Sequence, residues 1–465
     1  MDLTLSDEQR LLRESADRFV NETYTADHRR QIANDSLGFS ADIWKEFAEL
    51  GWLALPIAEA DGGLGGGAVE IGILMEAFGR GLVSEPYLST VVIGASLISE
   101  CGSEAQKQAL LPKIADGSLV LAFAHSERQA RFDLADVRST AKKTPDGWRL
   151  DGHKTAVLDG NAAGQIIVSA RVDEGNGKPG RLCLFLVPRG TSGLASRDFA
   201  RLGGGRACNL DLSDVRLPAD ALLGDGGDAL PAIEGAVDRA MAALGAEAVG
   251  IMLTLLDQTL EYTKIRKQFG RPLSANQVIR HRLADMAMQC DEARSMALRA
   301  ALMADAEPVA RSRAASGAKA KIGKSRDSWL SNRSSFTARW GSPRSSTSAP
   351  ISNGCSPSTR CSAAAPIIIA VTPRWAAVPS RHNGAQHGSY LRRRRTRFRE
   401  RGTRIHRGQP HAGDEARHRA DALGILRPRH RHGLAASAAQ KGLGRAGLAG
   451  GAWRTGLDAG SALDL

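Results

Sequence analysis

The chain has 465 residues, of which 42% are hydrophobic, and a formal net charge of +12. The positive charge is concentrated in residues 325–465, where 24 Lys and Arg stand against 7 Asp and Glu; this net +17 leaves −5 for the first 324 residues. The high isoelectric point therefore comes from the C-terminal segment, and the composition excludes a protein that is basic throughout.

No charged N-terminal segment followed by an apolar run opens the chain, and no run of about 18 apolar residues occurs, so neither secretion nor a membrane span is predicted. The four cysteines before residue 325 are scattered and lack metal-ligand spacing: Cys101, Cys183, Cys208 and Cys290. We expect free thiols, no bound metal and a cytoplasmic protein.

Residues 1–115 have the apolar spacing of helices. Ser6 and Ser40 are predicted N-caps of two helices, the second of which ends at Gly51. The apolar stripe of the first helix is expected to comprise Leu11, Leu12, Ala16 and Phe19. Further helices are expected over residues 70–78 and 88–101, and a glycine-rich loop over residues 61–67.

Within residues 116–226 the hydrophobic period changes to two, which is typical of strands. The runs are short, rich in β-branched and apolar residues, and closed by Gly, Pro or polar residues. Strands are expected over residues 120–124, 148–154, 165–171, 182–187 and 209–215. Closely spaced short strands predict a small β-sandwich or β-barrel.

Helical periodicity returns in residues 227–324. Long helices are expected over 233–266 and 276–306, and a third after Pro308 that is cut off at Lys324. Long antiparallel helices form a bundle, which is here incomplete. The predicted fold is therefore α+β and mostly α. It has an N-terminal helical domain, a middle β domain and a truncated C-terminal helix bundle, followed by a disordered, low-complexity basic tail over residues 325–465.

Several stretches resemble one enzyme family. The segment RKQFGRPL at residues 266–273, with Leu283-Ala284-Asp285-Met286 after it, resembles the acyl-CoA dehydrogenase signature between two long C-terminal helices. The glycine-rich turn at residues 56–67 is similar to the family's turn near the acyl-binding cleft, and the block order over residues 1–324 is also the family's. The stretch AFAHSERQAR at residues 122–131 most resembles small subunits of pimeloyl-CoA-type dehydrogenases.

The resemblance implies bound FAD. The residues that match the family's FAD-binding positions are Phe123, Ala124, Ser126, Arg266, Phe269 and Gln277. The first three belong to the strand that faces the flavin, and the last three reach the FAD of a neighbouring subunit. Cationic and amide donors suit a pyrophosphate, and an aromatic ring offers a stacking surface. In the alternative interpretation, Arg266 pairs with an acid of its own bundle and Phe269 belongs to the core.

Some positions depart from the family pattern. Ala156 and Leu158 stand where the family has Trp and Thr or Ser beside the flavin, so flavin shielding and one hydrogen bond are affected. Arg131-Phe132-Asp133 replaces a Gly-Ser-Asp that shapes the acyl-CoA cleft. His125 replaces an apolar residue and is either a titrating group near the flavin or a satisfied structural histidine.

The implied reaction is α,β-dehydrogenation of an acyl-CoA thioester, in which a carboxylate takes the α-proton and a hydride leaves the β-carbon for flavin N5. The family's usual base is a Glu that lies beyond Lys324, and its alternative position holds Ala240. Asp238 and Glu247 are expected to be solvated or capping charges. The catalytic residue is therefore unknown, and a non-catalytic structural subunit of a heteromeric dehydrogenase is the alternative function.

The resemblance also implies partners. Besides the acyl-CoA substrate, these are a homo-oligomer or a hetero-oligomer with a large acyl-CoA dehydrogenase subunit, and an electron-transfer flavoprotein or similar acceptor. No membrane and no specific nucleic acid are expected. The Arg run at residues 392–395 leaves open a nucleic-acid-binding arm, which predicts strongly salt-dependent DNA affinity. A folded tail domain is disfavoured, because Gly, Pro, Ser and Arg dominate without a period.

The tail has a further interpretation, a shifted reading frame. Trp340-Gly341-Ser342-Pro343 requires codons TGG-GGN-TCN-CCN, which moved back by one base permit Met-Gly followed by Val or Ile and then Thr. Extending the shift over residues 336–355 permits sequences that resemble the family's next motifs in the right order. In that frame the codon spanning Cys361 and Ser362, where the family has its Glu, cannot encode Glu.

Overall fold

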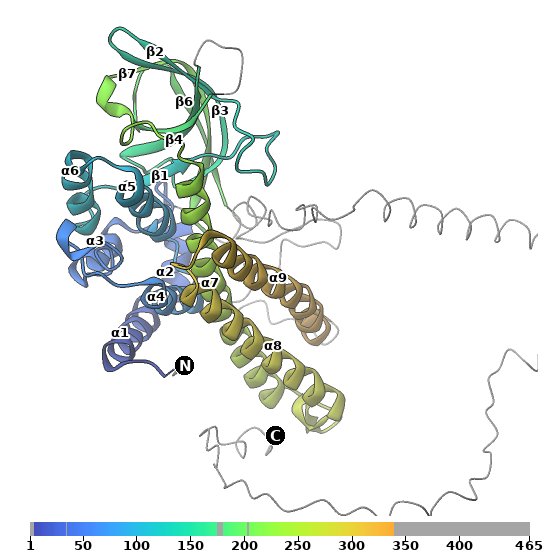
Figure 1. The fold of residues 1–465 in the computed structure, drawn as a ribbon. Coiled ribbons are helices and arrows are strands. Elements are labelled where there is room, and N and C mark those ends of the chain that lie inside the picture. The colour runs from blue at the N-terminus through green and yellow to red at the C-terminus, as the bar shows by residue number, and fades with distance from the viewer. Residues whose placement is uncertain (1–3, 34, 174–179, 202–203, 339–465) are drawn as a thin grey trace, which may run out of the picture. The chain divides into compact units, whose positions relative to one another are not determined.

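The computed structural model describes residues 4–33, 35–173, 180–201 and 204–338 (Figure 1). In chain order these form helices, a β-sheet and further long helices, which confirms the predicted fold class. The N-terminal helical elements are α1 (Asp7–Thr23), α2 (Ala26–Ala33), α3 (Ala41–Glu49), the single-turn η1 (Glu59–Asp61), α4 (Ala68–Gly81), the π-helical η2 (Leu88–Ala95), α5 (Ser96–Cys101) and α6 (Glu104–Ala115).

The predicted caps of α1 and α3 are confirmed. Ser6 forms a capping box with Gln9, and the Ser40 side chain accepts a hydrogen bond from the first turn of α3. The predicted apolar stripe of α1 was wrong at Leu11, which is 66% exposed, whereas Ala16 is fully buried. The buried face of α1 is narrower than the sequence pattern suggested, because α1 packs mainly on one neighbour, α4.

The middle region is one curled sheet, built around β4. Its strands are β1 (Leu121–Ala124), β2 (Thr140–Thr144), β3 (Gly147–Leu158), β4 (Gln165–Val172), β5 (Leu182–Pro188), β6 (Leu194–Ala200) and β7 (Arg206–Leu217), with η3 (Ala219–Ala221) after them. One edge of β4 pairs with β5, and the other pairs in parallel with β1 and then β2. Side chains on the inner face of the curl form a core of their own.

Two of these strands were not predicted. β2 reads TAKKT and has only one fully buried residue, and β6 lies at a sheet edge with almost every residue exposed. Neither strand therefore shows the alternation that marks a half-buried strand. The predicted strand over residues 148–154 was expected to enter a turn, but β3 continues to Leu158. Register shifts within β3 mark where the strand bends without ending.

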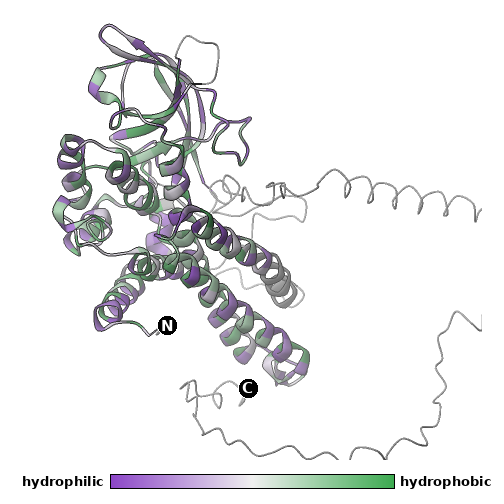
Figure 2. Ribbon diagram, viewed as in Figure 1, coloured by the Kyte–Doolittle hydropathy of each residue, from purple (hydrophilic) through white to green (hydrophobic). Residues whose placement is uncertain are grey.

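The C-terminal helices pack against α4 and against one another. The elements are α7 (Leu230–Ile265), the hairpin strands β8 (Lys267–Gln268) and β9 (Arg271–Pro272), η4 (Leu273–Ala275), α8 (Gln277–Leu302) and α9 (Pro308–Ala338). α4 and α7 approach closely at Gly79 and Gly250, where a Cβ atom would lie 2.0 and 1.9 Å from carbonyl oxygens of the other helix. Figure 2 shows hydrophilic and hydrophobic residues side by side along α1 and α8.

Among the described residues, α7 is the one helix long and apolar enough to cross a membrane, but 61% of its most apolar window is buried inside the protein, as in a core helix. The predicted end of the third bundle helix at Lys324 was wrong. α9 continues to Ala338, because residues 325–338 contain neither Gly nor Pro to end it. The remainder of the predicted tail, residues 339–465, lies outside the described residues.

Candidate functional site

β1 carries two of the predicted flavin-binding residues, and Ser126 follows it. β1 packs on η2, where the Thr90 hydroxyl donates to the Leu121 carbonyl at 3.2 Å and accepts from the Leu121 N–H at 3.0 Å. Ala124 is fully buried in the inner core of the sheet, whereas Phe123 and Ser126 are half-buried. Phe123 and Ser126 therefore keep surface that a ligand can contact, and the Ala124 side chain does not.

The backbone at Ser126 is fixed by the neighbouring strand. Its carbonyl accepts hydrogen bonds from the Thr155 N–H at 2.8 Å and from the Thr155 hydroxyl at 3.4 Å. The Ser126 hydroxyl itself makes no hydrogen bond within the described part of the chain. A fixed backbone with a spare hydroxyl is what the predicted contact with a flavin requires.

The structure favours the structural interpretation of His125. Its ring is 7% exposed, stacks on Phe123 at 5.3 Å between centroids, and places Nδ1 3.0 Å from the Ser169 hydroxyl. Burial and the nearby Lys154 ammonium lower the pKa of His125 to about 3. The imidazole is therefore neutral at physiological pH and has a hydrogen-bonding partner.

A buried ion pair between Lys154 and Glu127 lies next to the end of β1 and was not predicted from the sequence. Lys154 on β3 is fully buried and donates to Glu127 at 2.7 Å, to the Ser169 hydroxyl at 3.1 Å and to the His125 carbonyl at 3.4 Å. Glu127 also accepts hydrogen bonds from the N–H and hydroxyl of Ser139. This network ties β1, β3 and β4 together where the flavin is predicted to lie.

The pKa values of the pair follow from burial and mutual attraction. Burial, partly offset by Glu127, lowers the pKa of Lys154 to about 8. Burial alone would raise the pKa of Glu127, but Lys154 and the hydrogen bonds from Ser139 and Arg138 lower it to about 2. Lys154 is therefore mainly protonated and Glu127 deprotonated at pH 7, so the pair is ionised.

The departures from the family pattern lie in strained backbone. Ala156 has a φ of 54°, and its N–H donates to the Asn209 side chain at 3.0 Å, next to the register shift in β3. Arg131 has a φ of 51°, and Phe132 beside it is 38% exposed. Positive φ is unfavourable for these residues, so both segments are held by their surroundings.

The other predicted residues lie at the hairpin after α7. Phe269 and Gly270 form its two-residue turn with φ values of 51° and 80°, as in a type I′ turn. Phe269 is 91% exposed, so the alternative that it belongs to the core is wrong. Arg266 and Gln277 flank the hairpin and are also exposed.

Replacing Phe269 with glycine is expected to raise the free energy of unfolding by about 1 kcal/mol, because glycine relieves the positive φ and little buried surface is lost. Phe199→Gly is the matched control, because Phe199 lies in β6 without a positive φ and should destabilise the protein. Denaturant unfolding measures both. A marked loss of stability in Phe269→Gly would show that the ring is packed in solution.

The two groups of predicted flavin-binding residues lie in separate parts of the chain. β1 packs in the core cluster that contains the N-terminal half of α7, whereas Arg266 follows the C-terminal end of α7 (Figure 1). That cluster includes α7 residues as far as Ala246, and the part of α7 from Ala246 to Ile265 is about 29 Å long. This separation agrees with the prediction that the hairpin residues reach the FAD of a neighbouring subunit.

The family's alternative position for the base, on α7, holds no acid. Ala240 is 2% exposed and carries no functional group. The prediction that Asp238 is a solvated or capping charge was wrong: it lies within α7, is 6% exposed and accepts a hydrogen bond from Arg311 of α9 at 3.1 Å. Glu247 is half-buried, and burial raises its pKa to about 7.

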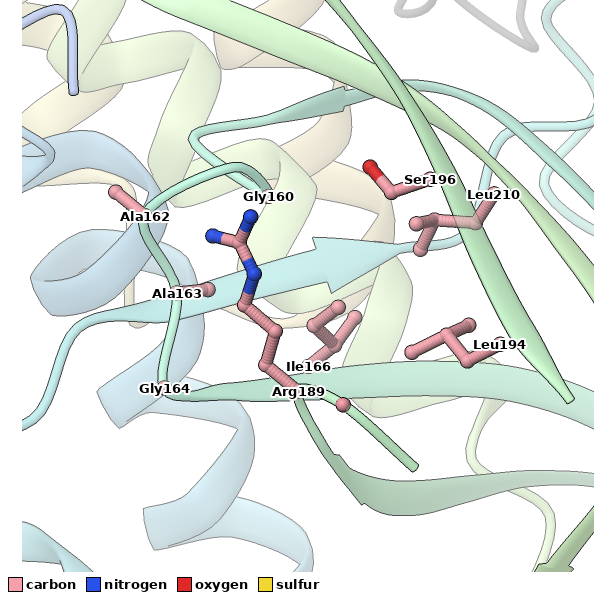
Figure 3. Close-up of a pocket in the computed structure, with 10 residues that line it drawn as sticks. Gly160, Ala162, Ala163, Gly164, Ile166, Arg189, Leu194, Ser196 and Leu210 are labelled. Atoms are coloured by element: carbon pink, nitrogen blue, oxygen red, sulfur yellow. The ribbon is translucent and has the colours of Figure 1, made fainter. Parts of the chain in front are cut away.

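A cavity of about 520 Å³ opens at one end of the curled sheet (Figure 3). Arg189 extends across it, and the hydrophobic floor includes Ile166, Leu194 and Leu210. None of the predicted flavin-binding residues lines it. This cavity is therefore separate from the predicted flavin position at the end of β1.

Three consecutive segments of the chain match the domains of known proteins. Residues 6–118 match the N-terminal domain of acyl-CoA dehydrogenases, residues 122–215 the middle domain and residues 230–327 the C-terminal domain. The chain belongs to the acyl-CoA dehydrogenase family. The probable acyl-CoA dehydrogenase YngJ of Bacillus subtilis is 32% identical over 311 residues, which is 66% of this chain and 81% of YngJ. Human mitochondrial short-chain specific acyl-CoA dehydrogenase is 33% identical over 280 residues, 59% of this chain and 68% of that protein.

Solved structures are similar over the same region. A glutaryl-coenzyme A dehydrogenase in complex with glutaryl-CoA has a TM-score of 0.67 at 25% identity and covers 76% of this chain and 90% of that chain. The ChsE4-ChsE5 complex of Mycobacterium tuberculosis has a TM-score of 0.62 at 25% identity, covering 72% and 88%. An acyl-CoA dehydrogenase is an oxidoreductase acting on CH–CH groups, and this membership supports FAD as the cofactor.

Proposed function

We propose that the chain is a subunit of a cytoplasmic, FAD-dependent acyl-CoA dehydrogenase that acts on a dicarboxylic acyl thioester of the pimeloyl type. The observation that supports an oligomer is that the predicted flavin-binding residues lie in two separate places. One group is on and after β1, beside the N-terminal half of α7, and the other is at the hairpin after the C-terminal end of α7. Bound FAD would accept the hydride released from the β-carbon at its N5. The half-buried Phe123 and Ser126 would orient it, and the exposed Phe269, Arg266 and Gln277 of a second chain would cover it.

The lack of an acid at Ala240, the family's alternative position for the base, favours a second candidate, a structural subunit of a heteromer. Ala240 cannot take a proton, and Asp238 is engaged by Arg311. In this case a large dehydrogenase subunit supplies the base, and an electron-transfer flavoprotein or similar acceptor reoxidises the flavin. The ChsE4-ChsE5 complex shows that a protein of this fold assembles with a different chain.

We also propose that the segment after Lys324 is out of frame. The family match ends at residue 327, close to the change in composition, and the shifted codons permit the family's next motifs. The nucleotide sequence around codon 324 tests this directly. We expect the 465-residue product to retain little flavin. A bundle that lacks its last helix exposes the apolar faces of the two preceding helices, which costs roughly 25 cal/mol for each Å² of burial lost. Normal flavin content in a soluble product of this length would contradict the proposal.

A complementation experiment in the frame-restored chain tests the shared site. Arg266→Gln at the hairpin and Ser126→Phe at the end of β1 should each reduce the flavin bound per chain, measured by absorbance. Because an intact site needs one group from each chain, mixed and reassembled variants should regain part of the lost flavin. Arg216→Gln, at an exposed ion pair in β7, is the control and should bind flavin normally.

No recovery on mixing would place both groups of residues in separate sites and overturn the shared flavin. Activity is then measured with and without a co-expressed large subunit. Ordinary acyl-CoA oxidation by the restored chain alone would reject the structural-subunit candidate.

A further inference from the structure

A second group of buried polar side chains lies where the sheet meets the N-terminal helices and α7. Asp159, at the end of β3, is 6% exposed and accepts a hydrogen bond from the Ser89 hydroxyl of η2 at 2.6 Å. Its N–H donates to the Arg206 carbonyl at 3.1 Å. Ser89 precedes Thr90, which holds β1, so this group adjoins the strand predicted to face the flavin.

Two arginines at the ends of the β6–β7 connection lie beside this group, and each has a buried nitrogen without a hydrogen-bond partner among the described residues. The Arg201 side chain is 17% exposed, and its ion-pair partner among the described residues, Asp159, is 3.9 Å away, beyond hydrogen-bond distance. Its Nε atom is buried and has no hydrogen-bond partner, and the same is true of the Arg206 Nε atom. Buried guanidinium donors without acceptors are costly, which indicates that an acceptor binds there.

The surroundings are shaped around these guanidinium groups. Gly205 and Gly38 have φ values of +69° and +82°, which favour glycine; a Cβ atom at Gly205 would lie 2.0 Å from Arg201 Nη2, and one at Gly38 would lie 2.7 Å from Arg206 Cγ. Asn161 is 5% exposed, and its Oδ1 atom also lacks a partner. These unsatisfied buried groups come from two separate connections, β3–β4 and β6–β7, which argues against a defect in a single loop.

The two nearby acids do not neutralise the two arginines. Burial raises the pKa of Asp159, although Arg201 and the Ser89 hydroxyl counteract this. Burial also raises the pKa of Glu247, which faces Arg201 from α7, to about 7. Glu247 is therefore partly protonated at neutral pH, and the group keeps an excess of positive charge.

We propose that Arg201, with Arg206, binds the free carboxylate at the far end of a dicarboxylic acyl chain. The inference rests on the proposed function and names the residues that would select its substrate. Planar guanidinium groups bind carboxylates through paired hydrogen bonds, and phosphate oxygens offer the same chemistry. We choose a carboxylate because the proposed substrate ends in one and because Ser89 and Thr90 of η2 connect Asp159, beside Arg201, to β1.

Calorimetric titration of the frame-restored chain with pimeloyl-CoA and heptanoyl-CoA tests this, because the two thioesters share every phosphate and differ at the far carboxylate. We expect pimeloyl-CoA to bind about 10- to 100-fold more tightly. Arg201→Gln should abolish that preference, and Arg201→Lys should retain part of it. Glu247→Gln, which removes a competing carboxylate, should increase it. Arg197→Gln, at an exposed ion pair with Asp211, is the control and should leave it unchanged.

The titration distinguishes a failure of this inference from a failure of the proposed function. Equal affinity of the wild-type chain for the two thioesters would overturn the carboxylate site and leave the proposed function standing. An Arg201→Gln variant that loses affinity for both thioesters equally would assign the arginine to the CoA phosphates instead. Binding of neither thioester would reject the proposed function and this inference with it. Thermal unfolding of each variant shows whether a loss of binding is a loss of the fold.

Discussion

Replacing Lys154 with methionine is expected to lower the free energy of unfolding by about 3–5 kcal/mol, as removal of one partner of a buried ion pair does elsewhere. Lys154 is fully buried, and Glu127, Ser169 and the His125 carbonyl all accept from its ammonium group. Methionine has a similar length, so the loss comes from the uncompensated Glu127 carboxylate rather than from a cavity. Denaturant unfolding of both proteins, extrapolated to water, measures the difference.

Two further variants make this prediction specific. Lys142→Met removes an ion pair with Asp173 whose side chains are 52% and 41% exposed, so we expect a loss below about 1 kcal/mol. Lys154→Met combined with Glu127→Gln removes both charges and should recover much of the stability. A loss for Lys154→Met no larger than that of Lys142→Met would mean that the pair is open to water in solution.

The local parts of the fold could be predicted because local chemistry determines them. A serine hydroxyl at Ser6 or Ser40 satisfies N–H groups of the next few residues, so the sequence nearby contains the whole interaction. The long helices α7 and α8 follow from apolar periodicity over many turns. The end of α9 was missed because a change in composition is not a helix stop unless Gly or Pro occurs.

The charged groups of the site could not be predicted, since their partners are distant in sequence. Asp238 was expected to be solvated, but Arg311 on α9 reaches it. Glu127 and Lys154 come from separate segments that only the curled sheet brings together. No periodicity marks such pairs, and a lysine on a strand usually points to solvent. Buried charge is therefore a property of the topology, not of the local pattern.

The structure decides between the two interpretations of Phe269. From sequence, a phenylalanine in a signature motif is consistent with either a core or a ligand contact. The structure excludes the core by exposure of 91% and holds the residue at a positive φ in a tight turn. An aromatic ring held in solvent at a positive φ motivates the hypothesis that the ring contacts something outside its own chain. This supports the proposal that the hairpin serves a second subunit.

His125 is expected to make the folded state sensitive to mild acid. Its pKa is about 3 in the folded protein against an ordinary value of 6.5. Below pH 6.5 the unfolded chain binds a proton that the folded chain does not. The stability from the neutral imidazole is therefore fully present above pH 6.5 and is lost as the pH falls toward 3, with a loss of roughly 2 kcal/mol by pH 5.

Glu247 acts in the opposite direction in the same range, so the wild-type curve alone is not diagnostic. With its pKa raised to about 7 from 4.5, the folded state binds the extra proton between these values and gains stability as the pH falls. The difference between wild type and His125→Gln, measured by denaturant unfolding at pH 6.5 and 5, isolates the histidine and should shrink by about 2 kcal/mol. Glu247→Gln should lose stability more steeply than wild type over this interval. Parallel curves for wild type and His125→Gln would show that water reaches the imidazole, and the network behind β1 would then be open in the folded protein.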